Sequence, residues 1–417
     1  MAINMWFYQV KEFYLITGGG NKSLPVNRIK QLQIEHDYHN FIVPVIRVVM
    51  VLEPDLYYRI VSNKNSAKIQ LRIDKYYKAN QSDTSKSKGA GTAISGLFDL
   101  IMDDNTNDLL FSQSTEAAIK NYKKVKESRM NDLKWTSNEI EFFLFRSRSL
   151  EWLKQKNLNV ILRDATVADA IAYVISRTGM EDILFAQPNN TAVYDVLLIP
   201  PSTTLQALKF IDIYYGIYST GTVFYFDHNY GYIIPFSGDC NAWRDDYDRR
   251  VNITIPRTSD TYRTHIYGEE GYGSSVRTFT ADYRSLDARN ESITNNYIIG
   301  NDVDIIDPYD GSSMSGTSGA TARSGNFIKL LENKTMNTML AKMYTAQSRS
   351  GSSVISAHLQ NADITVFTPN KEYSLEIDET KFSGEYKGKY MIAKCTHTFM
   401  NTGADFTVDT MCEFRRE

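Results

Sequence analysis

Three aspartates beside a tryptophan are the first candidates for chemistry. Asp245, Asp246 and Asp248 follow Trp243 closely in the chain. Glycosidases place two carboxylates across a sugar cleft lined by aromatic rings, and this run contains both residue types. The same run, RDDYDRR, also carries three arginines that match the aspartates in charge. We therefore favour a salt-bridged surface over a catalytic cleft here.

Two other groups could in principle move protons. His36 and His39 flank Asp37, and Glu139 and Glu141 are spaced so that both would lie on one face of a strand. No nucleophile signature lies near either group, and the sequence contains no GxSxG, HExxH or dinucleotide-binding glycine motif. We expect no catalytic residues and a protein that is not an enzyme.

Two patterns resemble metal sites only superficially. His265 precedes Glu269 and Glu270 in a strand-to-turn region, where positions four apart are too distant to share an ion. An acidic run ends at Gly311, but its spacing is not that of a calcium loop, and we read it as solvated. That run contains Asp302, Asp304, Asp307 and Asp310. We expect neither a metal nor a cofactor.

Phosphate binding is also not favoured. Residues 89–96, GAGTAISG, resemble a phosphate loop, but no lysine follows, so we expect a flexible loop. A basic helix over residues 116–133 is read as a solvated face, or as a face for an acidic partner. Its cations are Lys120, Lys123, Lys124, Lys126 and Arg129. The net charge of the chain is −3, which does not indicate a nucleic-acid binder.

Three cysteines occur, an odd number without a CxxC motif. Cys395 and Cys412 fall on the two arms of an expected hairpin and could lie near each other, whereas Cys240 is remote in sequence. A disulfide is one reading of the pair, and buried free thiols are the favoured one.

The elements that would position these residues are mostly strands. Residues 389–399 and 405–415 alternate around the turn MNTGA, which predicts a hairpin at residues 389–415. We expect Tyr390, Ile392, Phe406 and Val408 in its core and a structural role for His397. Residues 5–17, 29–38, 41–52, 56–61 and 67–77 also read as strands.

The predicted fold class is α+β and β-rich, with two tube-like antiparallel β-barrels and an intervening mixed α/β module. Residues 1–150 form the first barrel, interrupted by a loop and helix at 79–134 and completed by residues 137–150. Residues 151–250 form the module, and residues 251–325 form a polar, Tyr-rich segment and linker. Residues 326–417 form a helix (327–347) and the second barrel. The strands of this barrel include 352–360, 362–368 and 372–378. Residues 251–256 and 262–267 also look like strands.

Within the module, a capping pattern at Thr166 and Asp169 predicts a helix. A strand follows at 192–199, a second helix starts at 200–202 and ends at Gly216, and residues 222–227 and 230–236 form a hairpin.

Composition is typical of a soluble globular protein, with 42% hydrophobic and 12% aromatic residues. The longest apolar run, residues 41–52, contains Pro44 and Arg47 and is too short to span a bilayer. The first residues lack the pattern of a signal peptide. We expect a protein made in a reducing cytoplasm and not bound to a membrane.

Three passages resemble a known family. They are TVADAIAYVISRTG with PPSTTLQALKFIDIYYGIYSTGTVFYFDHNYGYIIP, then NTMLAKMYTAQSRSGSSVISAHLQNADITVFTPN, and GKYMIAKCTHTFMNTGADFTVDTMCEFRRE at the end. In order and spacing they are similar to the central baseplate hub protein of contractile-tailed bacteriophages. A more distant similarity is to phage late-control D proteins and the hub part of type VI secretion spikes. Residues 166–236 and 337–417 carry the resemblance.

The resemblance implies a virion protein assembled in the host cytoplasm. Such hubs are homotrimers in which two barrels per subunit adapt the six-fold tail tube to the three-fold central spike. The implied partners are further copies, the spike, the tail tube or its initiator, the end of the tape measure and baseplate wedge proteins. DNA would meet the protein only in transit through a polar, mostly non-basic lumen. The alternatives are a tail-associated cell-wall hydrolase using Asp245, Asp246 or Asp248, and a host-surface binding module using residues 262–300.

Overall fold

The fold was analysed in a computed structural model of the 417-residue chain. The structure describes residues 5–63, 66–78, 90–102, 138–150, 152–178, 183–226, 230–236, 250–255, 269–270, 276–280, 304–306, 313–315, 354–369, 371–377, 388–403 and 405–416. Structural statements below concern these residues.

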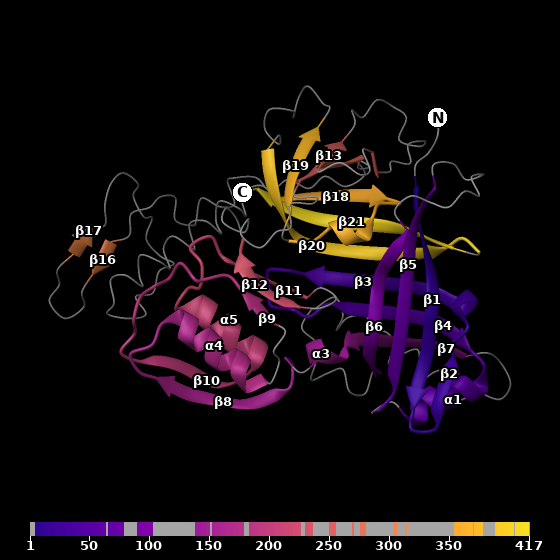
Figure 1. Ribbon diagram of the computed structural model, residues 1–417, viewed down its shortest axis with the longest axis horizontal. Helices are drawn as coiled ribbons and strands as arrows, with labels where there is room; N and C mark the ends of the chain where they lie inside the picture. The colour runs from indigo at the N-terminus through magenta and orange to yellow at the C-terminus, as the bar shows by residue number, and fades with distance from the viewer. Residues whose placement is uncertain are drawn as a thin grey trace.

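A closed barrel of eight antiparallel strands dominates the molecule (Figure 1). Its order is β20-β3-β4-β7-β6-β5-β1-β21, and β21 pairs back onto β20 to close the ring. The strands are β1 (Met5–Thr17), β3 (Ile29–Asp37), β4 (Val45–Leu52), β5 (Lys68–Lys78), β6 (Gly91–Ile101), β7 (Asn138–Arg146), β20 (Gly388–Asn401) and β21 (Phe406–Arg416). The barrel predicted for residues 1–150 therefore takes two of its eight strands from the far end of the sequence.

Large side chains fill the barrel. Trp6, Tyr8 and Phe142 are fully buried, and Phe399 and Val408 join them from the C-terminal strands. An eight-stranded barrel is just wide enough for its inward side chains to meet. A single copy therefore has a packed core and no pore along its axis.

The C-terminal hairpin, formed by β20 and β21, contributes side chains to two hydrophobic cores. Near its turn, Phe399 and Phe406 enter the barrel core; farther away, Tyr390, Ile392 and Phe414 enter a second core. A register shift between Ile392 and Lys394 marks a bulge. Because one extra residue reverses the alternation, Cys395, His397 and Phe399 are buried as well as Tyr390 and Ile392. The expected hairpin core residues are confirmed.

Strands outside the barrel extend the same sheet. Strand β18 (Val354–Gln360) pairs with β21, and β19 (Glu372–Ile377) pairs with β20. Beyond β19 the order continues through β13 (Arg250–Ile255), β15 (Val276–Thr280) and β14 (Glu269–Glu270). Among the described strands this extension is open. A second barrel and the domain boundaries given above stay predictions.

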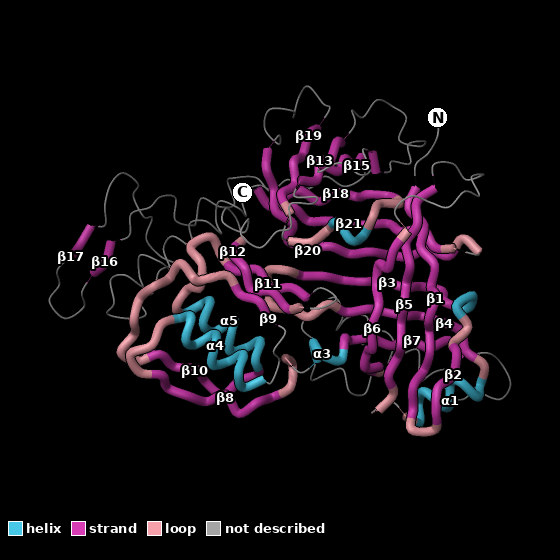
Figure 2. Tube along the Cα trace, in the orientation of Figure 1, coloured by secondary structure: helices cyan, strands magenta, loops and turns pink. Residues whose placement is uncertain are grey.

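The α/β module lies beside the barrel, with two helices against a two-stranded sheet (Figure 2). Its elements are β8 (Gln155–Leu162), α4 (Val167–Thr178), β9 (Ile183–Phe185), β10 (Leu197–Thr203), α5 (Thr204–Tyr214), β11 (Thr222–Phe226) and β12 (Gly231–Pro235). The predicted capping pair is present: Asp169 accepts from Thr166 N–H at 2.9 Å, and Asp169 N–H donates to the Thr166 hydroxyl at 3.2 Å. The 222–236 hairpin is confirmed.

The remaining described elements are short. They are β2 (Gly20–Ser23), α1 (Pro54–Ser62), α3 (Ser147–Leu150), β16 (Asp304–Ile306), β17 (Ser313–Ser315) and the 3₁₀ turns η1 (Val26–Arg28) and η4 (Ile364–Val366). Strands β16 and β17 pair with each other inside the segment expected to be a linker.

Several local predictions were wrong. Residues 56–61 form part of helix α1, which starts at Pro54, because proline is preorganised for the first helical turn. Residues 91–101, expected in the inserted loop, belong to β6, which pairs with β5 and β7. Helix α5 begins at Thr204 because Thr203 caps it, and residues 200–203 remain in β10. Residues 364–366 form a 3₁₀ turn capped by Asp363. The helices expected at 116–133 and 327–347 and the strand at 262–267 lie outside the described residues.

Candidate functional site: the outer wall of the barrel

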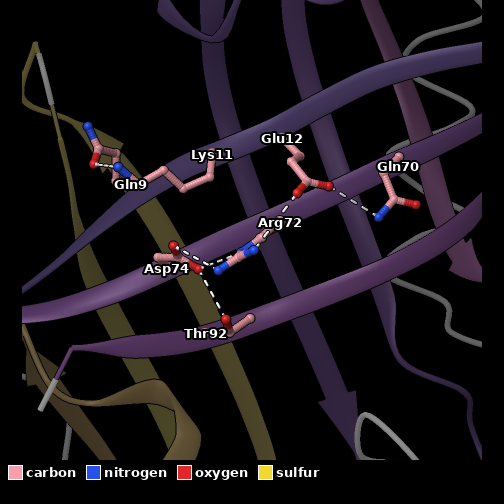
Figure 3. Close-up of polar contacts among 7 residues, drawn as sticks. All are labelled: Gln9, Lys11, Glu12, Gln70, Arg72, Asp74 and Thr92. Carbon is pink, nitrogen blue, oxygen red and sulfur yellow. Dashed lines mark hydrogen bonds and ion pairs between the residues drawn. The ribbon is translucent and has the colours of Figure 1, made fainter. Parts of the chain in front are cut away.

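Polar side chains cover the outside of the barrel where β1, β5 and β6 run side by side (Figure 3). Arg72 on β5 lies at the centre of this network. Its Nε donates to Asp74 Oδ1 at 2.9 Å, and its Nη1 is 3.9 Å from Glu12 Oε1 on β1. Thr92 on β6 donates its hydroxyl to Asp74 at 3.2 Å. Three strands thus share one cluster of a single guanidinium and two carboxylates, which we call the Arg72 network.

The acidic neighbours also stabilise the protonated, charged form of the Arg72 side chain. The hydrogen bond from Arg72 to Asp74, and then the charge of Asp74, raise the pKa of the guanidinium above its usual value. Gln70 completes the network by donating to the second Glu12 oxygen at 3.3 Å. Both carboxylates therefore already have protein donors.

Further ion pairs bridge strands elsewhere on the wall. Lys394 on β20 lies 3.3 Å from Asp37 on β3, and Lys68 on β5 lies 3.5 Å from Asp99 on β6. Arg47 on β4 pairs with Glu141 on β7, and Lys30 reaches Glu139 across β4. Opposite charges on facing strands attract one another, so residues that alternate outward become paired across the sheet.

Pairing of this kind matters more for the surface potential than for folding. Exposed ion pairs contribute little to stability, typically below about 1 kcal/mol. A protein that holds DNA does so by placing unneutralised cations against phosphates. On this wall, each named cation already faces a carboxylate, which weakens its attraction for phosphate.

The proton-transfer candidates do not form a catalytic group. His36 and His39 face inward, and burial lowers the pKa of each to about 3, with the charge of His397 adding to the effect at His36 and those of Arg415 and Lys394 at His39. Asp37 accepts hydrogen bonds from Asn40 and the His39 backbone and pairs with Lys394. Glu139 and Glu141 are each paired with a cation on the wall.

The metal and phosphate candidates are only partly described. Glu269 and Glu270 form the two-residue strand β14, and Asp304 starts β16. His265, the other aspartates of the 302–310 run, Trp243 with its aspartates, Cys240 and the basic helix lie outside the described residues. In the described part of the chain, no three His, Cys, Asp or Glu side chains are gathered to hold a metal ion. None of its helices has the length and apolarity needed to cross a bilayer.

A buried cluster on the C-terminal hairpin combines two thiols with an imidazole. Cys395 and Cys412 are directly opposite each other in the ladder, and both are free thiols with their Sγ atoms 3.3 Å apart. His397 Nε2 lies 3.4 Å from Cys395 Sγ. The hairpin pattern predicted the thiol pair, and strand alternation also placed His397 on the same face as Cys395, two positions away. The sequence did not show that the imidazole lies against the thiol.

The packed barrel, the open sheet extension and the α/β module together form a fold that is also seen in a solved tail protein. The structure resembles the tail protein from Neisseria meningitidis MC58, with a TM-score of 0.51 at 10% identity, covering 98% of this chain and 97% of that one. It also matches the 43 kDa tail protein of prophage MuSo2 from Shewanella oneidensis (TM-score 0.47, 10% identity, 96% of each chain). A component of the type VI secretion system of E. coli matches with a TM-score of 0.43 at 9% identity, over 93% of this chain and 74% of that one.

Sequence similarity identifies the particular family. Residues 3–416 match the family described as Bacteriophage PBS1 gene 109 protein, and the chain belongs to that family. No curated protein matches the chain in sequence.

Proposed function

We propose that this protein is the structural hub of a contractile tail baseplate. In this role, a homotrimer joins the six-fold tail tube to the three-fold central spike, and its lumen passes the tape measure and DNA. The second tube-like barrel belongs to this proposal, since a trimer needs two barrels per subunit to present six. The protein would not act as an enzyme.

The packed barrel interior carries the proposal. Because Trp6, Tyr8 and Phe142 fill it, one copy has no axial passage. A conduit then requires several barrels around a common axis, with their outer walls lining the lumen. The tail-protein fold and family membership support the same role.

The charge pattern of the wall suits such a lumen. DNA must move past the wall without being held, and in the Arg72 network the charges of Asp74 and Glu12 together outweigh that of the guanidinium. We propose the face formed by β1, β5 and β6 as part of the channel lining.

Assembly state tests the hub role. Mass photometry and particle imaging, with and without the cognate spike protein, should reveal a trimeric ring with six-fold character. A protein that stays monomeric at high concentration and also fails to bind its spike would contradict the proposal. Cell-wall clearing in a zymogram, abolished by Asp245→Asn, Asp246→Asn or Asp248→Asn, would favour the hydrolase instead.

The lumen proposal has its own test. Replacing Glu12→Gln and Asp74→Asn leaves Arg72 without its two carboxylates. Binding to duplex DNA should then strengthen and become more salt-dependent, with the slope of log K against log salt steeper by about 0.9 for each additional phosphate that the wall neutralises. The control is Glu53→Gln with Asp55→Asn, which removes the same charge at helix α1. Equal DNA binding by both double variants would contradict a role for the wall.

A further inference from the structure

The thiols of Cys395 and Cys412 are placed to form a bond. They face each other across β20 and β21, where opposite Cα atoms are typically about 4.5–5.5 Å apart. That range lies within the Cα separations that disulfides span, about 4.4–6.8 Å. Their Sγ atoms are already in contact at 3.3 Å. A cross-strand disulfide therefore needs only side-chain rotation and a small approach of the sulfur atoms.

An oriented imidazole lies beside this pair. His397 Nδ1 shares a hydrogen bond with the fully buried Thr410 hydroxyl at 3.0 Å, and Nε2 approaches Cys395 Sγ at 3.4 Å. Nδ1 also lies 3.9 Å from Cys395 Sγ, so the sulfur sits beside the imidazole ring, close to both nitrogens. An imidazole this close can take up the thiol proton and, once charged, stabilise the Cys395 thiolate.

The two thiols are electrostatically unequal. Burial alone would raise the pKa of Cys395, but the bond from Cys412 and the nearby His397 lower it to about 6. Burial, and the bond and charge of Cys395, raise the pKa of Cys412 well above its usual value. These opposite directions favour Cys395 over Cys412 as the thiol that gives up its proton first.

A cavity lies next to the cluster, on the side of His397. It has a volume of about 210 Å³ and is lined by His397, His36 and Tyr38, among others. His36, which lines the cavity, has a buried Nδ1 atom without a hydrogen-bond partner in the structure. Cys395 and Cys412 are themselves buried, so an oxidant reaches them only when the packing beside His397 opens transiently.

We propose that Cys395 and Cys412 form an oxidation site at which a peroxide creates a cross-strand disulfide. The Cys395 sulfur attacks one peroxide oxygen and breaks the O–O bond, and the departing hydroxide takes a proton to become water. Cys412 then attacks the resulting sulfenic acid, its proton leaves with the hydroxyl as a second water, and the S–S bond forms. Two thiols lose two electrons and two protons, and one peroxide is reduced to two waters.

A disulfide fits the geometry better than a metal site. The thiols touch each other directly, and no set of three ligands in the described residues is arranged around a common point. The bond would fasten the two strands that close the barrel, at the place where the hairpin passes from the barrel core to the second core. It would restrict the unfolded chain and so raise resistance to heat.

The experiment uses the full chain with Cys240→Ser, so that only the two hairpin thiols remain. Folded protein is treated with hydrogen peroxide, quenched, denatured, and assayed for thiols and mass. We expect loss of both thiols, a mass lower by two hydrogens, return of both thiols with reductant, and a melting temperature several degrees higher when oxidised. Cys412→Ala should instead stop at sulfenic acid and gain no thermal stability.

A second variant separates chemistry from folding. His397→Gln should slow disulfide formation on the order of tenfold, while the bond still forms at long times. An unchanged rate would remove His397 from the proposal. Two titratable thiols after prolonged peroxide, oxidation to sulfinic acid without an S–S bond, or stoichiometric zinc that blocks oxidation of the purified protein would each overturn the site.

Discussion

Lys75 and Asp363, far apart in sequence, form a buried ion pair with an Nζ–Oδ2 distance of 2.5 Å. Lys75 lies on β5, and Asp363 precedes η4 in the segment after β18. The Asp363 side chain is completely buried, and Lys75 also donates to Thr365 at 2.7 Å and lies over the Trp6 ring. This pair joins the C-terminal segment to the first strands of the barrel.

Breaking that pair should cost more than breaking one on the surface. Lys75→Met leaves the Asp363 carboxylate buried without its cation, and we expect the free energy of unfolding to fall by about 3 kcal/mol. Adding Asp363→Asn removes the stranded charge and should recover part of the loss. Lys30→Met, at the exposed Lys30–Glu139 pair, should change stability by less than about 1 kcal/mol. Chemical denaturation measures all of these, and equal effects at the two lysines would contradict the assignment.

Asp212 should make stability depend on pH. Burial raises its pKa to about 6, although the Thr222 hydroxyl and the Ile217 backbone bond to it and oppose the shift. The folded state therefore binds a proton more tightly than the unfolded state, and stability falls as pH rises from about 4 to about 6. Asp212→Asn should remove this loss, gaining up to about 3 kcal/mol relative to the parent above pH 6.

The control residue, Asp169, should make stability change with pH in the opposite direction to Asp212. Hydrogen bonds from Thr166 lower the pKa of Asp169, so its contribution to stability is present above its ordinary pKa and is lost as pH falls. Asp169→Asn should therefore lower stability at neutral pH and lose that effect in acid. A stability difference between Asp212→Asn and the parent that does not vary with pH would refute the assignment.

Gly231 should not tolerate a side chain. A Cβ atom there would lie 2.8 Å from both the Ile183 side chain and the Phe226 ring, in the core where β12 packs against β9 and β11. We expect Gly231→Ala to lower the free energy of unfolding by roughly 1–3 kcal/mol, the usual cost of overpacking. Gly91→Ala, which meets nothing within 4 Å, is the matched control and should be neutral. Similar melting temperatures for the two variants would disprove the packing argument.

A fragment of residues 1–150 should not fold alone. It lacks β20 and β21, so β1 and β3 would keep unpaired edges and the barrel core would stay open. Adding residues 388–417 through a flexible linker should restore soluble protein with cooperative unfolding by circular dichroism. A cooperative transition from the fragment alone would show that the C-terminal strands are dispensable.

Local patterns predicted what depends on local contacts. Alternation around Gly403 identified the hairpin, and the Thr166–Asp169 capping pair identified the start of α4. Strand β6 was missed because Gly91 and Gly96 read as a loop, and only its pairing with β5 and β7 makes it a strand. Barrel closure was missed for the same reason, since strands hundreds of residues apart must meet.

The candidate surface was the least predictable part. Alternation shows which residues point outward, but an ion pair such as Arg72 with Glu12 depends on the register between strands. Lys75 and Asp363 are separated by 288 residues, and no local signal links them. The Cys395–Cys412 pair was predictable because one short turn fixes its register.

The separation of β1 and β21 in the sequence delays closure of the barrel during translation. After Thr17, the last residue of β1, has been synthesised, the ribosome must still add all residues up to Phe406 before β21 can begin to close the barrel. At about 5–20 residues per second, that interval is roughly 20–80 s. Throughout it, the part of β1 that precedes its pairing with β2 has an unpaired edge, able to join the same strand of another nascent chain. The yield of native protein should therefore depend on how well this edge is shielded during translation, and slower translation should favour aggregation over assembly.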